Sequence, residues 1–408
     1  MGSGIAITGM GIISAIGKHV AENHASLVSG KAGISKISQI KTRHYGEIMV
    51  GEIPFQNHEL EECLQLDANS SSRTPMIGVM AAQEAIIHAG ITDINNCRTG
   101  LISGTTVGGM DKSEQYYYDY FERDTHWNHI GGLNAGDSTK KIASHLGLKE
   151  SFVTTISTAC SSGANAIMLG ARMIKSGRLD RVIVGGTDCL SKFTINGFKT
   201  LMIQSDTYNT PFDENRKGLN LGEAAAFLVL ESDKMVAKDN KKVLAYVKGY
   251  GNANDAYHQT ASSDHGDGAV LAMEKALKVA GLSPSAIDYV NAHGTATPNN
   301  DLSEGRALLR IFGDKVPEFS STKAFTGHTL AAAGSVEAVY SVLALQHNLV
   351  YPNLNFKTPM KEFHLIPETS VKEKELKTVL SNSFGFGGNC STLIFSKEPW
   401  QSQIRFFV

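Results

Sequence analysis

Short apolar runs alternate with segments in which apolar residues recur at helical spacing. Apolar and β-branched runs predict strands at 5–8, 100–103, 153–157, 181–184 and 224–231, with a further strand beginning near 242. The first strand is expected to end at Gly9. Helices are predicted at 74–89, 162–175 and 329–345, the first two stopped by glycines. This alternation indicates an α/β fold.

The second part of the chain repeats the plan of the first. Segments 81–90 and 272–281 are both Ala-rich helices closed by glycine, each followed by a strand that ends in small polar residues. Segments 157–160 and 321–323 each lead into a helix of small residues. We therefore predict two duplicated α/β halves. They cover residues 1–240 and 241–408.

Two segments of the first half, near 105–145 and 190–215, are predicted insertions. The first contains the irregular stretch 110–132, which is rich in aromatic residues. Insertions of this kind usually form a lid or contact a partner rather than fill the core. We expect this one to act as a cap.

Composition narrows the class of protein. The 408 residues are 42% hydrophobic and 19% charged, with a net charge of −2, which is typical of a globular protein and gives no support for nucleic-acid binding. No apolar run reaches the length of a membrane span. The five cysteines are scattered without a CxxC pair, so neither a disulfide framework nor a zinc site is indicated. A cytoplasmic location is expected.

Cys160 is the most informative cysteine. A β-branched run ends at Thr158-Ala159-Cys160, and small residues and a helix follow. A thiol on a strand-to-helix turn lies at the positive end of the helix, which favours the thiolate. The alternative is a buried, inert cysteine. The choice depends on whether partners for the thiol exist elsewhere.

Two later strands end in groups that suit a nucleophilic thiol. His293 is followed by Thr295 and Thr297, whose hydroxyls can hold a polar substrate arm. Another strand leads to Lys323 and His328. Each is a structural residue if taken alone. Glu304 is predicted to pair with Lys323.

A glycine-spaced turn near the C-terminus completes the set. It runs Phe384-Gly385-Phe386-Gly387-Gly388. Its free N–H groups can bind an oxyanion, and Phe386 can act as a movable cover.

Together these motifs resemble the elongating β-ketoacyl-acyl-carrier-protein synthases, condensing enzymes of the thiolase fold. The resemblance covers essentially the whole chain and preserves the order of the motifs: Thr8-Gly-Met-Gly11, Thr158-Ala-Cys-Ser-Ser-Gly163, Leu221-Gly-Glu-Ala224, His293-Gly-Thr-Ala-Thr297, Lys323, Gly327-His328 and Phe384-Gly-Phe-Gly-Gly388. It implies two halves packed as a layered αβαβα core. It also implies an acyltransferase that condenses malonyl-ACP with an acyl thioester by decarboxylative Claisen chemistry, giving 3-oxoacyl-ACP.

The resemblance also implies residue roles. Cys160 corresponds to the acyl-accepting nucleophile, and His293 and His328 to the histidines that promote decarboxylation and stabilise the enolate. Lys323 and Glu304 correspond to a supporting ion pair. The N–H groups of Cys160 and Phe386 correspond to the oxyanion hole, with Phe386 as the gate. The remaining correspondences are pantetheine or substrate contacts (Thr295, Thr297, Phe384) and a structural Na⁺ or K⁺ site (Asn291, Glu337, Asn382). No other cofactor is expected.

Several positions depart from the family pattern. The residue after Lys323 is Ala324 where serine is usual, and Asn389-Cys390 stands where Thr-Asn is usual. Segment 137–141 is polar where relatives have an apolar lining of the acyl pocket. These differences leave fatty acid, polyketide and polyene synthesis open. The family forms dimers, so a homodimer or a heterodimer with a related subunit is expected.

A non-catalytic chain-length or scaffold subunit of a ketosynthase heterodimer is the alternative function. Such subunits lack the nucleophilic cysteine, which this chain has. The other expected partner is acyl-carrier protein, an acidic protein that docks on basic side chains. Arg73, Lys140 and Lys141 are the candidates in the sequence.

Overall fold

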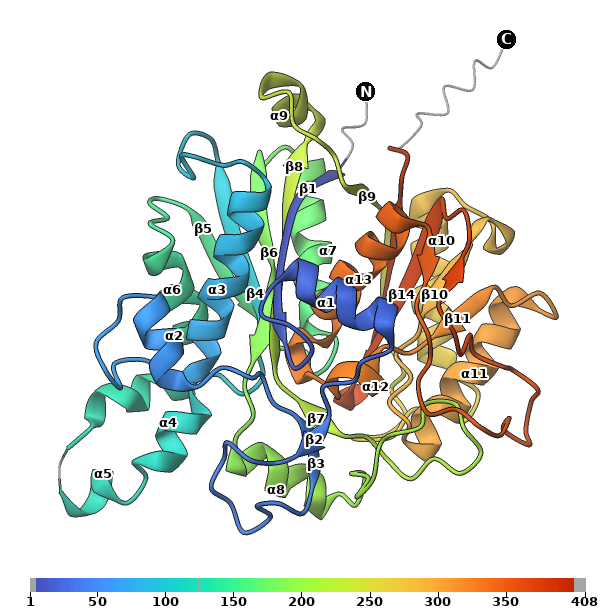
Figure 1. Ribbon diagram of the computed structural model, residues 1–408. Helices are drawn as coiled ribbons and strands as arrows, with labels where there is room; N and C mark the ends of the chain where they lie inside the picture. The colour runs from blue at the N-terminus through green and yellow to red at the C-terminus, as the bar shows by residue number, and fades with distance from the viewer. Residues whose placement is uncertain (1–4, 124, 400–408) are drawn as a thin grey trace.

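A ten-stranded mixed sheet forms the centre of the molecule. The structure, a computed structural model, describes residues 5–123 and 125–399 (Figure 1). The outer ends of the two predicted halves, 1–4 and 400–408, lie outside the described residues. Strand order is β11-β10-β14-β15-β9-β1-β8-β6-β4-β5. The predicted α/β class is therefore confirmed.

Each half of the chain contributes five neighbouring strands to this sheet. The first half supplies β1 (Ile5–Ser14), β4 (Thr99–Gly104), β5 (Phe152–Ile156), β6 (Arg181–Asp188) and β8 (Ala224–Ser232). The second supplies β9 (Ala245–Asn254), β10 (Tyr289–Asn291), β11 (Glu318–Ser320), β14 (Thr378–Gly385) and β15 (Asn389–Ser396). In both, the three outer strands are parallel and the inner pairings antiparallel. The predicted repeat thus appears as matching strand orders.

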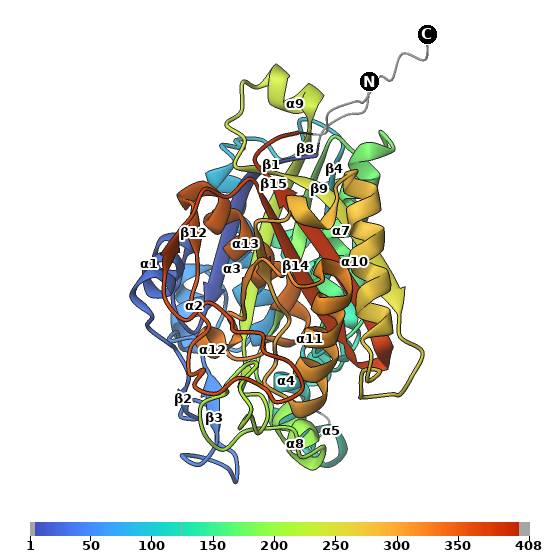
Figure 2. The ribbon, with the colours of Figure 1, turned by 90° about the vertical axis from the view of Figure 1, so that its right-hand side faces the viewer.

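Helices cover the sheet in matching layers. α3 (Arg73–His88) packs on β1, β8 and β6, and α10 (Asp267–Ala280) packs on β9, β15 and β14. Between the halves lie α7 (Ser162–Lys175) and α13 (Ala333–His347), which contact each other and strands of both halves (Figures 1 and 2). If the two halves of the sheet are counted as separate β layers, the arrangement is the five-layered αβαβα core that the resemblance implies.

The first strand is longer than predicted. β1 continues past Gly9 to Ser14, with a register shift between Ile7 and Gly9. A Cβ at Gly11 would lie 2.1 Å from the Ala81 carbonyl oxygen of α3, and one at Gly251 of β9 would lie 2.0 Å from the Ala272 carbonyl oxygen of α10. The glycines in these strands therefore permit close helix packing rather than end the strand.

The aromatic insertion is partly helical rather than irregular throughout. It contains α4 (Met110–Gln115), α5 (Asp119–Glu122) and the 3-10 helix η1 (Trp127–Leu133), and leads into α6 (Ala135–His145). Five apolar side chains of this stretch are exposed: Tyr117, Tyr118, Phe121, Trp127 and Leu133. Figure 1 shows α4 and α5 projecting from the body. The predicted helix 329–345 is also refined, because a short 3-10 turn, η3 (Leu330–Ala332), precedes α13.

The remaining elements lie mostly at the edges of the core. A small sheet consists of β2 (Ser35–Lys36), β3 (Met49–Gly51) and β7 (Leu221–Gly222), and a second one of β12 (Leu349–Val350) and β13 (Lys372–Glu373). The other helices are α1 (Val20–Ser29), α2 (Asn57–Cys63), α8 (Lys192–Thr200), α9 (Asp233–Lys238), η2 (Pro284–Ala286), α11 (Pro298–Phe312), α12 (Lys323–Thr326) and η4 (Phe386–Gly388). Across 5–123 and 125–399, no helix has the length and apolarity needed to cross a membrane.

Candidate active site

Cys160 lies on a tight turn between β5 and α7. Ala159 has a positive φ of 52°, an uncommon conformation for a residue with a side chain. Ser161 is the N-cap residue of α7, and Cys160 immediately precedes it. The thiol is buried, with 6% of the residue exposed. The predicted strand–turn–helix context of the thiol is therefore present.

His328 is the direct partner of the thiol. Its Nε2 lies 2.9 Å from the Cys160 Sγ, and the imidazole is buried. Burial lowers the pKa of His328 well below its usual value, and the nearby Lys323 ammonium acts in the same direction. His328 is therefore neutral at neutral pH and can accept the thiol proton.

Burial of Cys160 acts against the thiolate that the helix N-terminus favours. Burial raises the pKa of Cys160 to about 12, although the Lys323 charge and a hydrogen bond from the Phe386 backbone N–H both oppose this shift. Loss of solvation outweighs these two favourable contacts because burial destabilises the charged thiolate relative to the neutral thiol. At neutral pH the site holds a thiol, and the nucleophile must be generated by proton transfer.

The second imidazole is held by Lys323. The Lys323 Nζ lies 3.2 Å from the Nδ1 of His293, and both side chains are buried. An ammonium can only donate, so Nδ1 accepts and the ring proton of neutral His293 resides on Nε2. Burial, together with the Lys323 charge, lowers the pKa of His293 well below its usual value. The two imidazole rings are perpendicular, with centroids 5.4 Å apart.

Glu337, not Glu304, is the carboxylate partner of Lys323. Lys323 forms a buried ion pair with Glu337, which the sequence analysis assigned to a cation site. The Glu304 carboxylate instead accepts the backbone N–H groups of His293 and Gly294 at 2.9 and 2.8 Å. The predicted Lys323–Glu304 pair is therefore wrong, because Glu304 on α11 is occupied by the turn that carries His293.

The other predicted substrate contacts surround this centre. The Thr295 and Thr297 hydroxyls are 2.9 Å apart, and Phe384 packs against the His293 ring with a centroid distance of 5.5 Å. Phe386 stacks on Phe198 of α8 at 5.7 Å. Phe198 was not singled out in the sequence, because it lies far from every motif.

The three residues assigned to a cation site differ in their contacts. Both side-chain polar atoms of Asn291 are buried without a hydrogen-bond partner, and its Oδ1 is an oxygen of the kind that binds Na⁺ or K⁺. Glu337 is paired with Lys323, and the Asn382 Oδ1 accepts the Thr392 hydroxyl at 2.8 Å. Ser381, which is opposite Asn291 across β10 and β14, also has a buried hydroxyl without a partner. The free oxygens are therefore those of Asn291 and Ser381.

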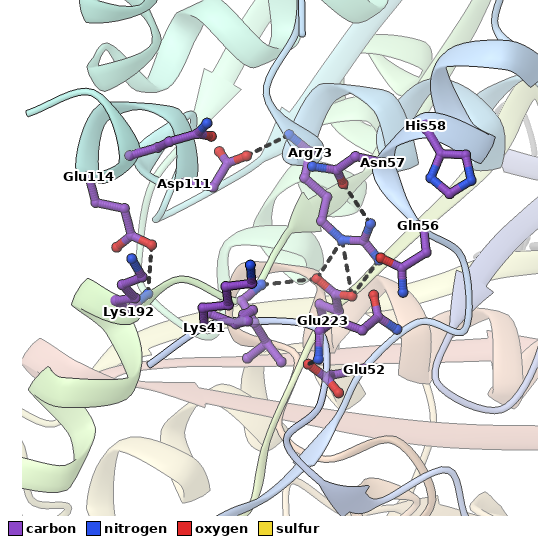
Figure 3. A pocket seen from close by; sticks show the side chains of 14 residues that line it. Lys41, Glu52, Gln56, Asn57, His58, Arg73, Asp111, Glu114, Lys192 and Glu223 are labelled. Atoms are coloured by element: carbon purple, nitrogen blue, oxygen red, sulfur yellow. Dashed lines mark hydrogen bonds and ion pairs between the residues drawn. The ribbon is translucent and has the colours of Figure 1, made fainter. Parts of the chain in front are cut away.

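Arg73 is unsuitable for docking a carrier protein. It is buried, and its guanidinium binds the Glu223 carboxylate at 2.7 Å and Asn57 at 2.8 Å (Figure 3). These contacts form one wall of a polar cavity of about 350 Å³. Lys141 is half-buried and pairs with Asp137 at 2.8 Å, whereas Lys140 is exposed. Of the three candidates, Lys140 alone offers a fully exposed cation.

Comparison with known proteins agrees with this geometry. The N-terminal domain of the β-ketoacyl synthases matches residues 3–235, and their C-terminal domain matches residues 244–357. The 3-oxoacyl-[acyl-carrier-protein] synthase 2 of Staphylococcus aureus (strain N315) is 34% identical over 409 residues, covering 96% of this chain and 98% of the relative.

Two solved structures are similar over nearly the full length. One is the ishigamide ketosynthase/chain length factor, with a TM-score of 0.92, 30% identity, and coverage of 98% of this chain and 100% of that chain. The other is a type II PKS acyl-carrier protein in complex with its ketosynthase bound to the hexaketide, with a TM-score of 0.88, 25% identity and the same coverage.

Fold and site together define a thiol-dependent condensing enzyme of the acyltransferase class. The chain belongs to the β-ketoacyl synthase family. Its reaction is the decarboxylative Claisen condensation that yields a 3-oxoacyl thioester. The alternative of a non-catalytic subunit is not favoured, because the described residues retain the buried Cys160–His328 pair beside His293 and Lys323.

Proposed function

We propose that this condensing enzyme extends acyl chains carried by acyl-carrier protein, with Cys160 holding the acyl group. The observation that carries the proposal is the 2.9 Å contact between the Cys160 Sγ and the His328 Nε2, next to the His293–Lys323 pair. Cys160 attacks the acyl thioester carbonyl while its proton passes to His328 and then to the departing pantetheine thiol. The N–H groups of Cys160 and Phe386 stabilise the oxyanion.

Condensation follows on the acylated enzyme. The malonyl C–C bond breaks, CO₂ leaves, and the electron pair forms an enolate on the thioester carbonyl. The Nε2–H of His293 donates to that oxygen. His328 accepted the thiol proton at Nε2 during acylation and gave it up, so it is the second donor only after its remaining ring proton moves from Nδ1 to Nε2. The enolate carbon then attacks the acyl-Cys160 carbonyl, and Sγ leaves as a thiolate that takes up one proton from water, replacing the proton lost on acylation. The product is a 3-oxoacyl chain two carbons longer.

A surface groove supports a docking site for the acidic carrier. Residues 38–45 and the start of α8 line a groove of about 820 Å³, the basic groove, which contains the exposed cations Lys41, Arg43 and Lys192. None of these three forms an ion pair with another described residue. The same helix carries Phe198 against the gating Phe386. A carrier in the basic groove would therefore stand beside the gate, attracted by opposite charge.

Acylation by a loaded carrier tests this proposal. Incubation with acyl-ACP should add the acyl mass to the peptide that contains Cys160, and malonyl-ACP should then release a 3-oxoacyl-ACP. The double variant Arg43→Glu/Lys192→Glu should acylate at least about tenfold more slowly from acyl-ACP at low salt, because charge repulsion slows encounter. Its rate with an acyl-pantetheine thioester should not change.

Lys278→Glu/Lys315→Glu is the matched control, since it makes the same change in charge at exposed lysines of α10 and the loop after α11. Equal losses in both double variants would place the docking site elsewhere. Absence of any acylation of the unmodified enzyme would contradict the proposed function itself.

The aromatic insertion and the sheet edge favour assembly with a second, related subunit. β5 is an edge strand, and among the described strands it pairs with β4 alone. In the aromatic insertion, Tyr118 and Phe121 are 71% and 76% exposed. Exposed apolar patches of this kind mark protein interfaces. Because the similar ishigamide structure is that of a ketosynthase/chain length factor, we propose a heterodimer with a chain-length-factor subunit.

Native mass spectrometry checks the assembly. Co-expression with a chain-length-factor subunit should give a 1:1 complex, and condensation should require both chains. Replacement of Tyr118 and Phe121 by serine should weaken that complex, whereas Ile87→Ser, at an exposed apolar residue of α3, should not. An active homodimer of this chain alone would contradict the heterodimer.

A monovalent cation remains a proposal. Asn291 and Ser381 would supply oxygen ligands, because their side chains are buried and unpartnered. When bound, such an ion would supply positive charge between the carboxyl end of β10 and the middle of β14. Glu337 would not be a primary ligand while it pairs with Lys323.

A further inference from the structure

Asn389 connects the gating turn to the turn that carries the nucleophile. It is the first residue of β15 and directly follows the gate turn, residues 385–388. Its Oδ1 lies 2.7 Å from the Ser161 Oγ and accepts the Asn165 Nδ2 at 2.9 Å. It also accepts the Asn252 Nδ2 at 2.9 Å. One amide oxygen thus links α7, β9 and β15.

These partners belong to the turn and helix around Cys160. Ser161 is fully buried and is the residue next to the nucleophile. Asn165, one turn further along α7, also donates to the Thr158 hydroxyl at 2.9 Å. A Cβ at Gly385 would lie 2.8 Å from the Thr158 carbonyl oxygen and 3.1 Å from the Cys160 N. The start of the gate turn therefore packs directly against the turn that carries Cys160, the nucleophile turn.

The outer part of the gate turn is held differently. Gly387 is exposed; its N–H donates to the Gln259 carbonyl at 2.7 Å, and its carbonyl accepts the Asn254 Nδ2 at 2.9 Å. The Asp255 N–H donates to the Gly388 carbonyl at 2.8 Å. These contacts reach only the loop 254–259, near the surface. None of these three contacts is made by the Asn389 side chain.

We propose that Asn389 is a positioning residue that fixes the hinge of the gate to the nucleophile turn. This inference rests on the proposed function of Cys160 and Phe386. After Phe386 has moved, the anchored hinge brings the Phe386 backbone N–H back beside the Cys160 N–H. Both N–H groups then face the thioester oxygen again. The threonine usual at this position in the family has a hydroxyl in place of the amide.

The test compares two reactions of the same thiol. Acylation of Cys160 needs the oxyanion hole, whereas alkylation by iodoacetamide forms no oxyanion. Asn389→Leu should slow single-turnover acylation by about 10- to 100-fold, because misplaced catalytic groups lose rate on this scale. Alkylation should remain within about twofold of the unmodified enzyme, and the KM for the acyl donor should change little. Asn389→Asp, which keeps acceptor oxygens, should recover part of the acylation rate.

Two further variants keep the inference falsifiable. Asn252→Ala removes one donor and leaves the gate turn intact, so it should reduce acylation in the same direction by a smaller factor. Asn95→Leu is the control, because that amide contacts the backbone at Gly147 and Lys149, in the loop between α6 and β5. Unchanged acylation in Asn389→Leu, or equal losses of acylation and alkylation, would overturn the positioning role. If the unmodified enzyme is not acylated, the proposed function fails instead.

Discussion

Replacement of Cys160 by alanine abolishes condensation but leaves malonyl-thioester decarboxylation. In the proposed reaction the Cys160 Sγ, which His328 contacts directly, accepts the acyl group, and alanine has no atom that can replace it. We expect the rate of 3-oxoacyl formation to fall by at least about 10³-fold, the scale seen when a covalent nucleophile is removed. Decarboxylation persists because its donors lie on the two imidazoles.

Two assays on one sample separate these steps. Release of CO₂ from malonyl thioester reports decarboxylation, and mass spectrometry of the thioester product reports condensation. Cys189→Ala is the matched control, because Cys189 is another buried thiol, bonded to the Thr74 hydroxyl away from the imidazoles. That variant should keep both activities. Condensation at the normal rate in Cys160→Ala would contradict covalent catalysis at this residue.

The placement of site residues at the carboxyl ends of strands was predictable from the sequence. Cys160 follows β5 and Lys323 follows β11, which occupy matching outer positions in the two halves of the sheet. His293 follows β10, the neighbour of β11. Strand periodicity and the repeat place these positions at one end of the sheet, so local sequence carries the information.

Pairings across the core were not predictable from spacing. Glu304 is nearer than Glu337 to His293 in sequence, yet α11 directs it to two backbone N–H groups. Glu337 reaches Lys323 because α13 lies between the two halves of the sheet. The sequence shows the helix N-terminus that favours the Cys160 thiolate, but it does not show the burial that raises the pKa of this thiol. Such choices depend on packing, which only the folded chain defines.

Lys323→Met removes the only cation that neutralises Glu337 among the described residues, and it should cost both stability and activity. Breaking a buried ion pair typically destabilises a protein by about 3–5 kcal/mol, because one charge is left uncompensated. Activity should fall by at least about 10²-fold, since the Nδ1 of His293 loses the donor that keeps its proton on Nε2. Denaturant unfolding and single-turnover condensation measure the two effects.

The loss of stability should grow with pH. Burial already raises the pKa of Glu337 to about 7, and loss of the Lys323 charge raises that pKa further. The folded variant then holds a proton that the unfolded chain releases above its ordinary carboxyl pKa of about 4.3. Its stability is therefore favoured at low pH and declines as pH rises through the folded pKa. The free energy of unfolding of the variant should be closer to that of the unmodified enzyme at pH 5.5 than at pH 8.

A second substitution separates the structural role of Lys323 from its role in catalysis. Lys323→Met/Glu337→Gln has no buried charge at either position, so much of the lost stability and the pH dependence should disappear. Condensation should remain impaired, because methionine cannot donate to the His293 Nδ1. Recovery of activity together with stability would show that Lys323 serves only to neutralise Glu337. Stability recovered without activity would establish that the Lys323–His293 contact sets the tautomer on which decarboxylation depends.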